Sequence, residues 1–240
     1  MRMSFGGPND RRPRGEWAWP ASSLLGGLTT PSRKRMLALG VRVWYPADRI
    51  LMRESEDTTF VMILLDGVVK ATGRTHDGRE ALLAVRMGGD LVGEFAGLDG
   101  RPRSATVTSC GPLAALTVTR AEFLDCLRRD PAIALAVNEA IVTKLRVANS
   151  RRIDFTGCDV ATRLARVLHQ IAMTYGERVG GGAVIRWPIT QPELATLSGA
   201  AEPTVHKALR ALRDSGAIST GYRSIRIEDL ALLSRMAFAE

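Results

Sequence analysis

Short apolar runs interrupted by turn signals fill the chain between residues 41 and 118. The runs are rich in β-branched residues, and turn pairs such as Asp66-Gly67 and Asp77-Gly78 separate them. Runs of this length and composition favour β-strands joined by tight turns. The pattern predicts strands over 41–45, 59–65, 68–72, 81–85, 105–108 and 114–118. Several short strands in succession are typical of a closed β-roll or sandwich.

Helical periodicity replaces the strand pattern after residue 120. A short amphipathic helix is expected over 121–129, where Asp130-Pro131 ends it, and a longer helix over 132–155 contains neither Gly nor Pro. Shorter helices are expected over 31–39 and 160–173. The triple glycine at 180–182 is interpreted as a flexible joint.

The long helix carries an apolar stripe made of Val137, Ile141, Leu145 and Ala148, at spacings of four, four and three residues. Side chains at this spacing lie on one face of a helix. Two interpretations of the stripe stay open. It packs on the β-roll of its own chain, or it forms a seam with the same helix of a second copy, which the length of the helix favours.

The segment between residues 189 and 218 predicts two short helices joined by a tight turn. Thr190 and Glu193 have the spacing of a capping box, which starts a helix, and Gly199 ends that helix. Pro203 lies in the first turn of a second helix, where its missing N–H is tolerated. A hairpin over 218–227 follows, at the place of a wing. The pattern favours a winged helix-turn-helix over the alternative, a plain helical hairpin.

A helix-turn-helix places the start of its second helix in the major groove of DNA. Glu202 has an acceptor for cytosine N4 and Lys207 a donor for guanine, although Glu202 equally suits the positive end of a helix dipole. The start of the first helix and the wing are expected to contact phosphates. The predicted DNA-binding residues are Thr190, Gln191, Glu202, Pro203, Thr204, His206, Lys207, Arg210, Tyr222 and Arg223.

Composition and charge argue against several classes of protein but do not by themselves indicate a function. The net charge is +8, but residues 1–35 hold seven Lys and Arg against two Asp and Glu, so most of the excess lies there. Residues 1–20 are interpreted as a flexible basic arm. The 3 Cys and 3 His are scattered, which favours reduced thiols and argues against a metal site. No apolar stretch suits a membrane helix or a secretory signal, so a cytoplasmic protein is expected.

One glycine-containing stretch has chemistry suited to a cyclic phosphate on a sugar. Gly93 lets backbone approach the sugar closely, and Glu94 is an acceptor for a ribose 2′-hydroxyl. Arg103 offers a forked guanidinium to the phosphate, and Ser104-Ala105 offers a hydroxyl and backbone N–H groups. The alternative is a structural salt bridge between Glu94 and Arg103 in a roll that binds nothing.

The two motifs, at 89–106 and 189–218, together resemble the cyclic AMP receptor protein and fumarate–nitrate regulator family of bacterial transcription factors. The resemblance covers about residues 36–230. It implies an α+β protein with an N-terminal jelly-roll cyclic-nucleotide-binding domain over 21–131, a dimerisation helix over 132–156 and a winged helix-turn-helix over 157–240. The implied partners are a second copy of the chain, double-stranded DNA at a pseudo-palindromic operator and RNA polymerase.

The resemblance also assigns residues around the ligand. It adds Phe95, Ala96 and Lys144 to the cofactor-binding set. It places Ala148 and Asn149 where the family's cyclic-AMP binders carry a Thr-Ser pair that contacts adenine. The Asn149 side chain has a donor and an acceptor for a purine edge, whereas the Ala148 side chain has neither. The expected cofactor is a cyclic nucleotide, cyclic AMP or cyclic GMP, with its base left open.

Other sensors of the family fit this chain less well. Iron–sulfur members carry an N-terminal cysteine cluster, which residues 1–35 lack, and His76 in a predicted turn is unsuited to holding a haem. No metal, haem or iron–sulfur cofactor is expected. The family's best-known half-site is read by an Arg-Glu pair and a later Arg. This chain has Glu202, Pro203 and Lys207 at those places, so a different operator is expected.

Three other functions are weighed against a ligand-controlled regulator. A constitutive DNA-binding regulator with an empty sensor keeps the DNA reader and needs no ligand. A cyclic-nucleotide-binding regulatory subunit acts by protein contact and needs no helix-turn-helix. An enzyme is not expected, because the sequence has no nucleophile–base set, metal cluster or P-loop.

Overall fold

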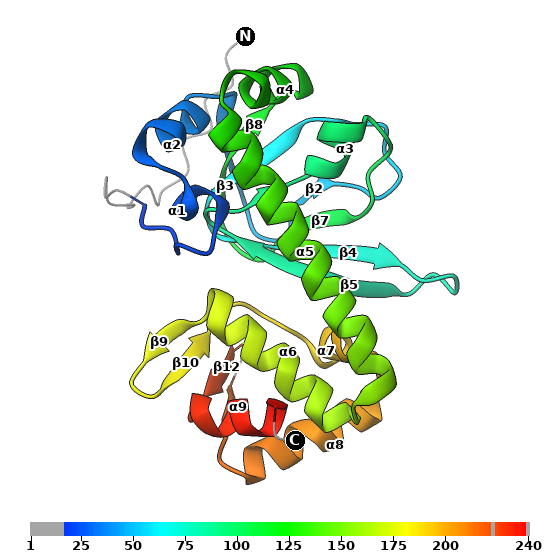
Figure 1. Ribbon diagram of the computed structural model, residues 1–240. Helices are drawn as coiled ribbons and strands as arrows, with labels where there is room; N and C mark the ends of the chain where they lie inside the picture. Colours follow the sequence, from blue (N-terminus) through cyan, green and yellow to red (C-terminus); the bar gives the residue numbers. More distant parts are fainter. Residues whose placement is uncertain (1–16, 222–223, 239–240) are drawn as a thin grey trace.

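Two four-stranded sheets form the β-roll in the upper half of the molecule (Figure 1). The structure is a computed structural model that describes residues 17–221 and 224–238. The first sheet has the strand order β1 (Val41–Tyr45), β8 (Leu113–Val118), β3 (Val61–Asp66) and β6 (Leu91–Val92). The second has the order β2 (Ile50–Met52), β7 (Thr106–Ser109), β4 (Val68–Arg74) and β5 (Glu80–Met87). All pairs in both sheets are antiparallel.

Strand β3 is buried on both faces, which explains its unbroken apolar run. Met62 and Leu64 belong to the core between the two sheets. Val61, Ile63 and Leu65 point to the other face, where the helices of the domain cover the sheet. Successive side chains of a strand point to opposite faces, so a strand covered on both sides carries no polar alternation.

The structure confirms the six predicted strands of the β-roll, with their ends shifted by no more than two residues. Strands β2 and β6 were not predicted. They have 3 and 2 residues. The alternation of apolar and polar residues that marks a strand cannot be recognised over such short segments. These strands form because they pair with neighbours that are distant in the sequence.

Helices cover the outer face of the first sheet. Asp130 caps the longest helix, because its carboxylate accepts from the backbone N–H groups of Ala132 and Ile133. The same carboxylate accepts from Ser32 Oγ at 3.0 Å and Arg35 Nε at 2.8 Å, which ties α2 to α5. The helices of this part are α1 (Leu24–Gly27), α2 (Thr30–Leu37), α3 (Glu94–Asp99), α4 (Arg120–Arg129) and α5 (Pro131–Gly157).

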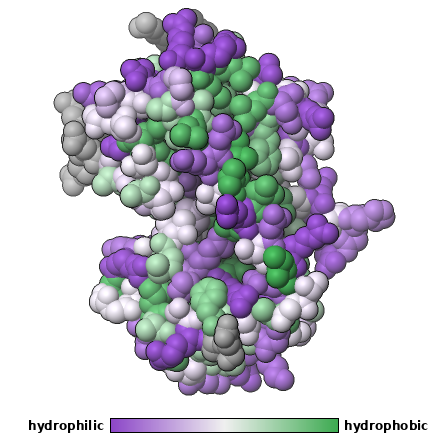
Figure 2. Space-filling view, viewed as in Figure 1, coloured by the Kyte–Doolittle hydropathy of each residue, from purple (hydrophilic) through white to green (hydrophobic). Residues whose placement is uncertain are grey.

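Only part of the predicted apolar stripe of α5 is exposed and free to contact a second copy. Val137 is 1% exposed and packs in the core of its own roll, with Ile141 beside it. Apart from Phe155 near its end, the large apolar side chains that α5 leaves exposed form a set that shares only Leu145 with the predicted stripe, and apolar groups gather along the helix (Figure 2). This exposed stripe consists of Leu135, Val142, Leu145 and Ile153.

The C-terminal half is a small helical domain with a four-stranded sheet of order β11-β12-β10-β9 (Figure 1). Its helices are α6 (Val160–Tyr175), α7 (Gln191–Ser198), α8 (Glu202–Asp214) and α9 (Leu230–Phe238). Its strands are β9 (Glu177–Val179), β10 (Gly182–Ile185), β11 (Ile218–Gly221) and β12 (Ser224–Ile227). The expected flexible joint at 180–182 is wrong, because these glycines form the β9–β10 turn and Gly182 pairs with Val179.

The two halves contact each other through β4 and β5 on one side and α7 on the other. Leu82 and Val85 of β5 share one apolar core with residues of α6, α7 and α8. Lys70 Nζ of β4 donates to Glu193 Oε1 of α7 at 2.6 Å, and both side chains are largely buried. The backbone N–H of Leu82 donates to Thr196 Oγ1 at 2.9 Å. Polar and apolar contacts together fix how α7 lies on the β-roll.

Candidate ligand cavity and nucleic-acid interface

A cavity of about 470 Å³ lies in the β-roll beside α5. Strands β2, β4, β5, β6 and β7 and helix α3 supply its walls, and α5 closes one side. Its volume falls in the range of small-molecule sites, roughly 300–1,000 Å³. The predicted cofactor-binding residues that line it are Gly93, Glu94, Phe95, Ala96, Arg103, Ser104, Ala105 and Lys144.

Gly93 forms the left-handed turn that starts α3 at the edge of the cavity. Its φ is +79°, and a Cβ atom there would lie 2.6 Å from Arg103 Nη1 and 2.7 Å from Met52 Cε. Both the backbone conformation and the crowding therefore require glycine. The turn places Glu94 in the first turn of α3, with its carboxylate turned inwards and 5% of the residue exposed.

Arg103 is a buried cation that the surrounding backbone holds in place. Its guanidinium donates to Thr58 Oγ1 at 2.9 Å, to the Gly93 carbonyl at 3.1 Å and to the Phe60 carbonyl at 2.7 Å. It also lies 4.6 Å from the centre of the Phe60 ring. Burial lowers the pKa of Arg103, although the nearby Glu56 and Glu94 oppose this shift. A buried cation whose hydrogen-bond acceptors are all neutral is well placed to bind an anion.

Glu94 pairs with Lys144, and the alternative salt bridge to Arg103 is wrong. Lys144 Nζ of α5 donates to Glu94 Oε1 at 2.8 Å and to the Leu91 carbonyl at 2.8 Å. Burial lowers the pKa of Lys144, and the attraction of Glu94 opposes this effect. Through this contact α5 is tied directly to the start of α3.

Asn149 is the one predicted cofactor-binding residue that lies outside the cavity lining. Its side chain is exposed on α5, while its neighbour Ala148 lines the cavity. The helix therefore presents mostly apolar groups to the cavity, among them Ile141 and Leu145. The prediction for Asn149 stays untested by a single copy of the chain.

Several residues around the cavity were not predicted. Thr58 and Phe60 hold the Arg103 guanidinium from a segment without regular structure, and nothing in their local pattern marks them. Arg86 lines the cavity from β5. The sequence could have indicated this residue, because it is a single charged residue directly after the apolar run 81–85. Charged residues at the end of a buried strand are candidates for a site.

The second candidate site is the exposed face of α8. The capping box of α7 is present, since Glu193 N–H donates to Thr190 Oγ1 at 3.3 Å and Thr190 N–H donates to Glu193 Oε2 at 2.7 Å. Gly199 ends α7 in the left-handed conformation, with φ +59°. The capping box and the left-handed Gly199 fix where α7 begins and ends. The tight turn that follows connects α7 to α8, as in a helix-turn-helix.

Helix α8 has one buried and one exposed face. Val205, Ala208, Leu209 and Leu212 are buried against the rest of the domain. The predicted DNA-reading side chains all lie on the exposed face, and they are Glu202, Pro203, Thr204, His206, Lys207 and Arg210. Thr190 and Gln191 are exposed at the start of α7. The hairpin β11–β12 has the place of a wing, but Tyr222 and Arg223 lie outside the described residues.

Two family models match the two halves of the chain. Residues 42–130 match the cyclic nucleotide-binding domain, and residues 162–236 match the Crp-like helix-turn-helix domain. The CRP-like cAMP-activated global transcriptional regulator of Mycobacterium tuberculosis is 31% identical over 193 residues, which cover 80% of this chain and 86% of the relative. The chain belongs to the Crp/Fnr family of transcription regulators.

Further proteins similar to this Crp/Fnr-family regulator support the same family assignment. The cyclic AMP receptor protein of Thermus thermophilus is 28% identical over 90% of this chain and 97% of its own length. The structure of FixK2 from Bradyrhizobium japonicum matches with a TM-score of 0.72 at 20% identity, covering 84% of this chain and 99% of that chain. This likeness confirms the α+β fold with an N-terminal β-roll and a C-terminal winged helix-turn-helix.

The regulator is thus a Crp-like DNA-binding transcription regulator with a cyclic nucleotide-binding domain. Its relatives are transcription regulators and not enzymes. Within the described residues, no three His, Cys, Asp or Glu side chains are grouped as metal ligands would be. None of the helices in the described ranges has the length and hydropathy to cross a membrane.

Proposed function

We propose that the regulator binds cyclic AMP in the cavity of its β-roll and, as a homodimer, binds a pseudo-palindromic DNA operator in response. The observation that carries this proposal is the pair of Glu94 and Arg103, an acidic and a basic side chain that both line one cavity large enough for a nucleotide. The names of relatives from Mycobacterium tuberculosis and Thermus thermophilus support cyclic AMP as the first nucleotide to test.

Each end of the ligand has a chemical counterpart in the cavity. The cyclic phosphate binds Arg103, whose three protein hydrogen bonds leave two of its five N–H groups for the ligand, with Ser104 and the Ala105 backbone beside it. The ribose 2′-hydroxyl donates to Glu94, which Lys144 holds in position. Gly93 leaves room for the sugar, because any side chain there meets Arg103.

The purine base is expected between β5 and α5. Leu83 and Ala84 line the cavity from β5, and Leu145 and Ala148 line it from α5. These small and apolar groups suit the faces of a purine ring but do not distinguish adenine from guanine. A polar contact from Asn149 to the base edge stays a prediction.

The DNA interface follows from the exposed face of α8. Lys207 and Glu202 are proposed to contact base edges, and Thr190 and Gln191 to contact phosphates. Two copies of α8 in successive major grooves lie roughly 34 Å apart, which requires an operator with twofold symmetry. Contact with RNA polymerase stays an expectation from the family.

The exposed apolar stripe of α5 is the proposed dimer seam. Leu135, Val142, Leu145 and Ile153 are 60%, 47%, 58% and 69% exposed in one copy. They lie on one side of the helix, and burying them against the same helix of a second copy removes this apolar surface from water. Because α5 also lines the cavity, a ligand there acts directly on the seam.

Calorimetry with cyclic AMP and cyclic GMP tests the ligand. The wild-type protein should bind cyclic AMP, and Arg103→Ala should weaken binding by at least about tenfold, because the phosphate loses its charged partner. Arg101→Ala is the control, since Arg101 is an exposed arginine of the same loop. If neither nucleotide gives a binding signal with folded wild-type protein, the cavity is not a cyclic-nucleotide site.

Selection of DNA sites with and without cyclic AMP separates the remaining functions. The proposal expects palindromic sites that are enriched only with the nucleotide. Equal enrichment in both conditions indicates a constitutive regulator with an empty sensor. The absence of any enriched site, together with nucleotide binding, indicates a regulatory subunit that acts by protein contact.

A further inference from the structure

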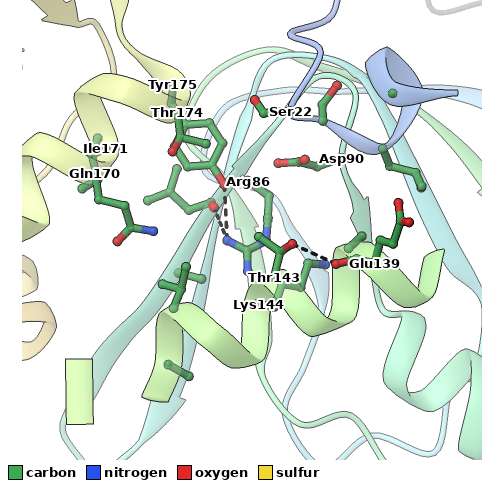
Figure 3. Close-up of a pocket in the computed structure, with 18 of the residues that line it drawn as sticks. Ser22, Arg86, Asp90, Glu139, Thr143, Lys144, Gln170, Ile171, Thr174 and Tyr175 are labelled. Carbon is green, nitrogen blue, oxygen red and sulfur yellow. Dashed lines mark hydrogen bonds between the residues drawn. The ribbon is translucent and has the colours of Figure 1, made fainter. Parts of the chain in front are cut away.

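A second cavity, of about 330 Å³, lies between the β-roll and the C-terminal domain. Strand β5 and helix α5 supply its walls on one side, α6 supplies another, and the segment 21–27 around α1 also lines it (Figure 3). The α5 residues that line it include a row made of Ala136, Ala140, Thr143 and Val147. At 3.6 residues per turn, this row is rotated by roughly 130° from the exposed apolar stripe, so a second copy packed on that stripe does not fill the cavity.

Two arginines of the sensor line this cavity without a carboxylate partner. Within the described residues, neither Arg86 nor Arg151 is in an ion pair. Arg151 donates to the Leu83 carbonyl at 2.8 Å and to Gln170 Oε1 at 3.1 Å, while its Nε is buried and has no acceptor among the described residues. Burial and the nearby Arg86 lower the pKa of Arg151. The Arg151 guanidinium therefore lacks a compensating negative charge, and the positive charge of Arg86 nearby adds to this need.

The facing helix α6 contributes neutral polar groups. Gln170, Thr174 and Tyr175 point toward the cavity from α6, and Arg86 points at Tyr175 from the opposite wall (Figure 3). Arg86 Nη1 donates to Tyr175 Oη at 3.4 Å. Burial raises the pKa of Tyr175 to about 12, so its hydroxyl keeps its proton and remains a hydrogen-bond donor.

Among the described residues, the acidic side chains of the cavity form no ion pair with these arginines, although Arg86 and Lys144 attract the Asp90 carboxylate from a greater distance. Asp90 accepts from the backbone N–H of Met87 at 3.1 Å, and burial raises the pKa of its carboxyl. Glu139 is an exposed residue at the rim of the cavity. The interior thus offers two guanidinium groups, amide and hydroxyl donors, and apolar walls.

We propose that this interdomain cavity is a second ligand site, which takes a small molecule carrying a carboxylate or phosphate group between Arg86 and Arg151. The oxyanion accepts from both guanidinium groups, and Thr174 and Tyr175 of the C-terminal domain complete the site. The ligand contacts both domains at once. It therefore stabilises the domain arrangement in which these walls face each other, and changes the affinity for DNA.

This site does not depend on cyclic nucleotide binding, although the two cavities share walls. Arg86, Lys144 and Ala148 line both of them. Occupation of one cavity is thus expected to alter the other. The phosphate partner of the first cavity, Arg103, does not line the second, so variants distinguish the two sites.

Calorimetry with citrate and with inorganic pyrophosphate, on full-length protein with and without cyclic AMP, tests the proposal. At least one probe should bind saturably, and the responding probe identifies the carboxylate or the phosphate class. Arg151→Gln and Arg86→Gln should each weaken binding by at least about tenfold. Arg152→Gln is the matched control, because Arg152 is the exposed neighbour on α5.

A second variant guards against a loss of folding. Gln170→Glu places a carboxylate beside Arg151, where it should raise the melting temperature and abolish binding of the probe, because it supplies the missing charge. Arg103→Ala should lose cyclic AMP and keep the probe. The proposal is overturned if folded wild-type protein binds neither probe saturably, or if Arg152→Gln weakens binding as much as Arg151→Gln.

Discussion

Gly93 is a residue at which a single methyl group would change the shape of the ligand cavity. Alanine at this position would adopt a φ of +79° and crowd both Arg103 and Met52. A left-handed alanine costs roughly 1–2 kcal/mol, and the displaced guanidinium adds to this. We expect Gly93→Ala to lower the melting temperature and to remove cyclic AMP binding in calorimetry.

Gly111→Ala is the matched control for that substitution. Gly111 has no heavy atom within 4 Å of a built Cβ and no positive φ. Its replacement should leave both the melting temperature and the affinity for cyclic AMP within error. Wild-type affinity in Gly93→Ala would show that the cavity does not need the close approach of Arg103 and the Gly93 turn.

At the scale of residues, the sequence predicted most of the motif side chains that line the cavity but not how they are paired. Glu94 and Arg103 belong to a recognisable motif, so their convergence was predicted. Their partners are not local. Lys144 lies 50 positions from Glu94, and Phe60 lies 43 positions from Arg103. Only the tertiary fold brings such residues together, so the sequence left a Glu94–Arg103 salt bridge open.

At the scale of elements, the contact between β4 and α7 couples the sensor to the DNA reader. Glu193 has two tasks there, because Oε2 caps α7 and Oε1 accepts from Lys70. Glu193→Gln keeps the capping-box chemistry and removes the charge of the pair. We expect urea unfolding to show a coupling of about 1 kcal/mol between Glu193→Gln and Lys70→Met in a double-mutant cycle.

The exposed pair Arg226 and Glu228 is the reference for this cycle. Its side chains are 48% and 42% exposed, and both lie within the C-terminal domain. The same cycle on Arg226→Met and Glu228→Gln should give a smaller coupling, since water screens an exposed pair. A coupling of zero for Lys70 and Glu193 would mean that the ion pair does not hold the two domains together.

The shortest strands that the sequence missed have a common reason, whereas the helices α1, α3 and α9 were also not predicted. Strands β2, β6 and β9 have 3, 2 and 3 residues and are defined by their partners. The glycines at 180–182 were interpreted as a flexible joint from their local sequence alone. In the structure the strand that follows them, β10, pairs with β12 and is an inner strand of the sheet. The long helix was predicted to within two residues at its ends, but periodicity could not say which face its own roll covers.

At the scale of the whole molecule, α5 links every function of the regulator. Lys144 and Ala148 line both cavities, and Leu145 belongs to the ligand cavity and to the exposed apolar stripe. A ligand that moves α5 therefore acts on the domain arrangement and on the seam together. Such coupling requires that the ligand bind one arrangement more tightly than the other.

Val142 offers the sharpest test of the proposed dimer, because it is 47% exposed in one copy and lines neither cavity. A charged side chain there is solvated in a monomer but buried beside its own copy in a dimer. We expect Val142→Lys to keep the wild-type circular dichroism spectrum and to sediment as a monomer. Its affinity for a selected palindromic site should fall by at least about tenfold, because the second half-site no longer adds to binding.

Ser150→Lys is the control for that variant, since Ser150 is exposed on α5 and lies outside the apolar stripe. It should remain a dimer and bind the palindrome as the wild type does. Cyclic AMP binding should persist in Val142→Lys if one copy supplies the whole cavity, and fall if Asn149 of a second copy completes it. A dimeric Val142→Lys with unchanged DNA affinity would place the dimer seam elsewhere than on the exposed stripe of α5.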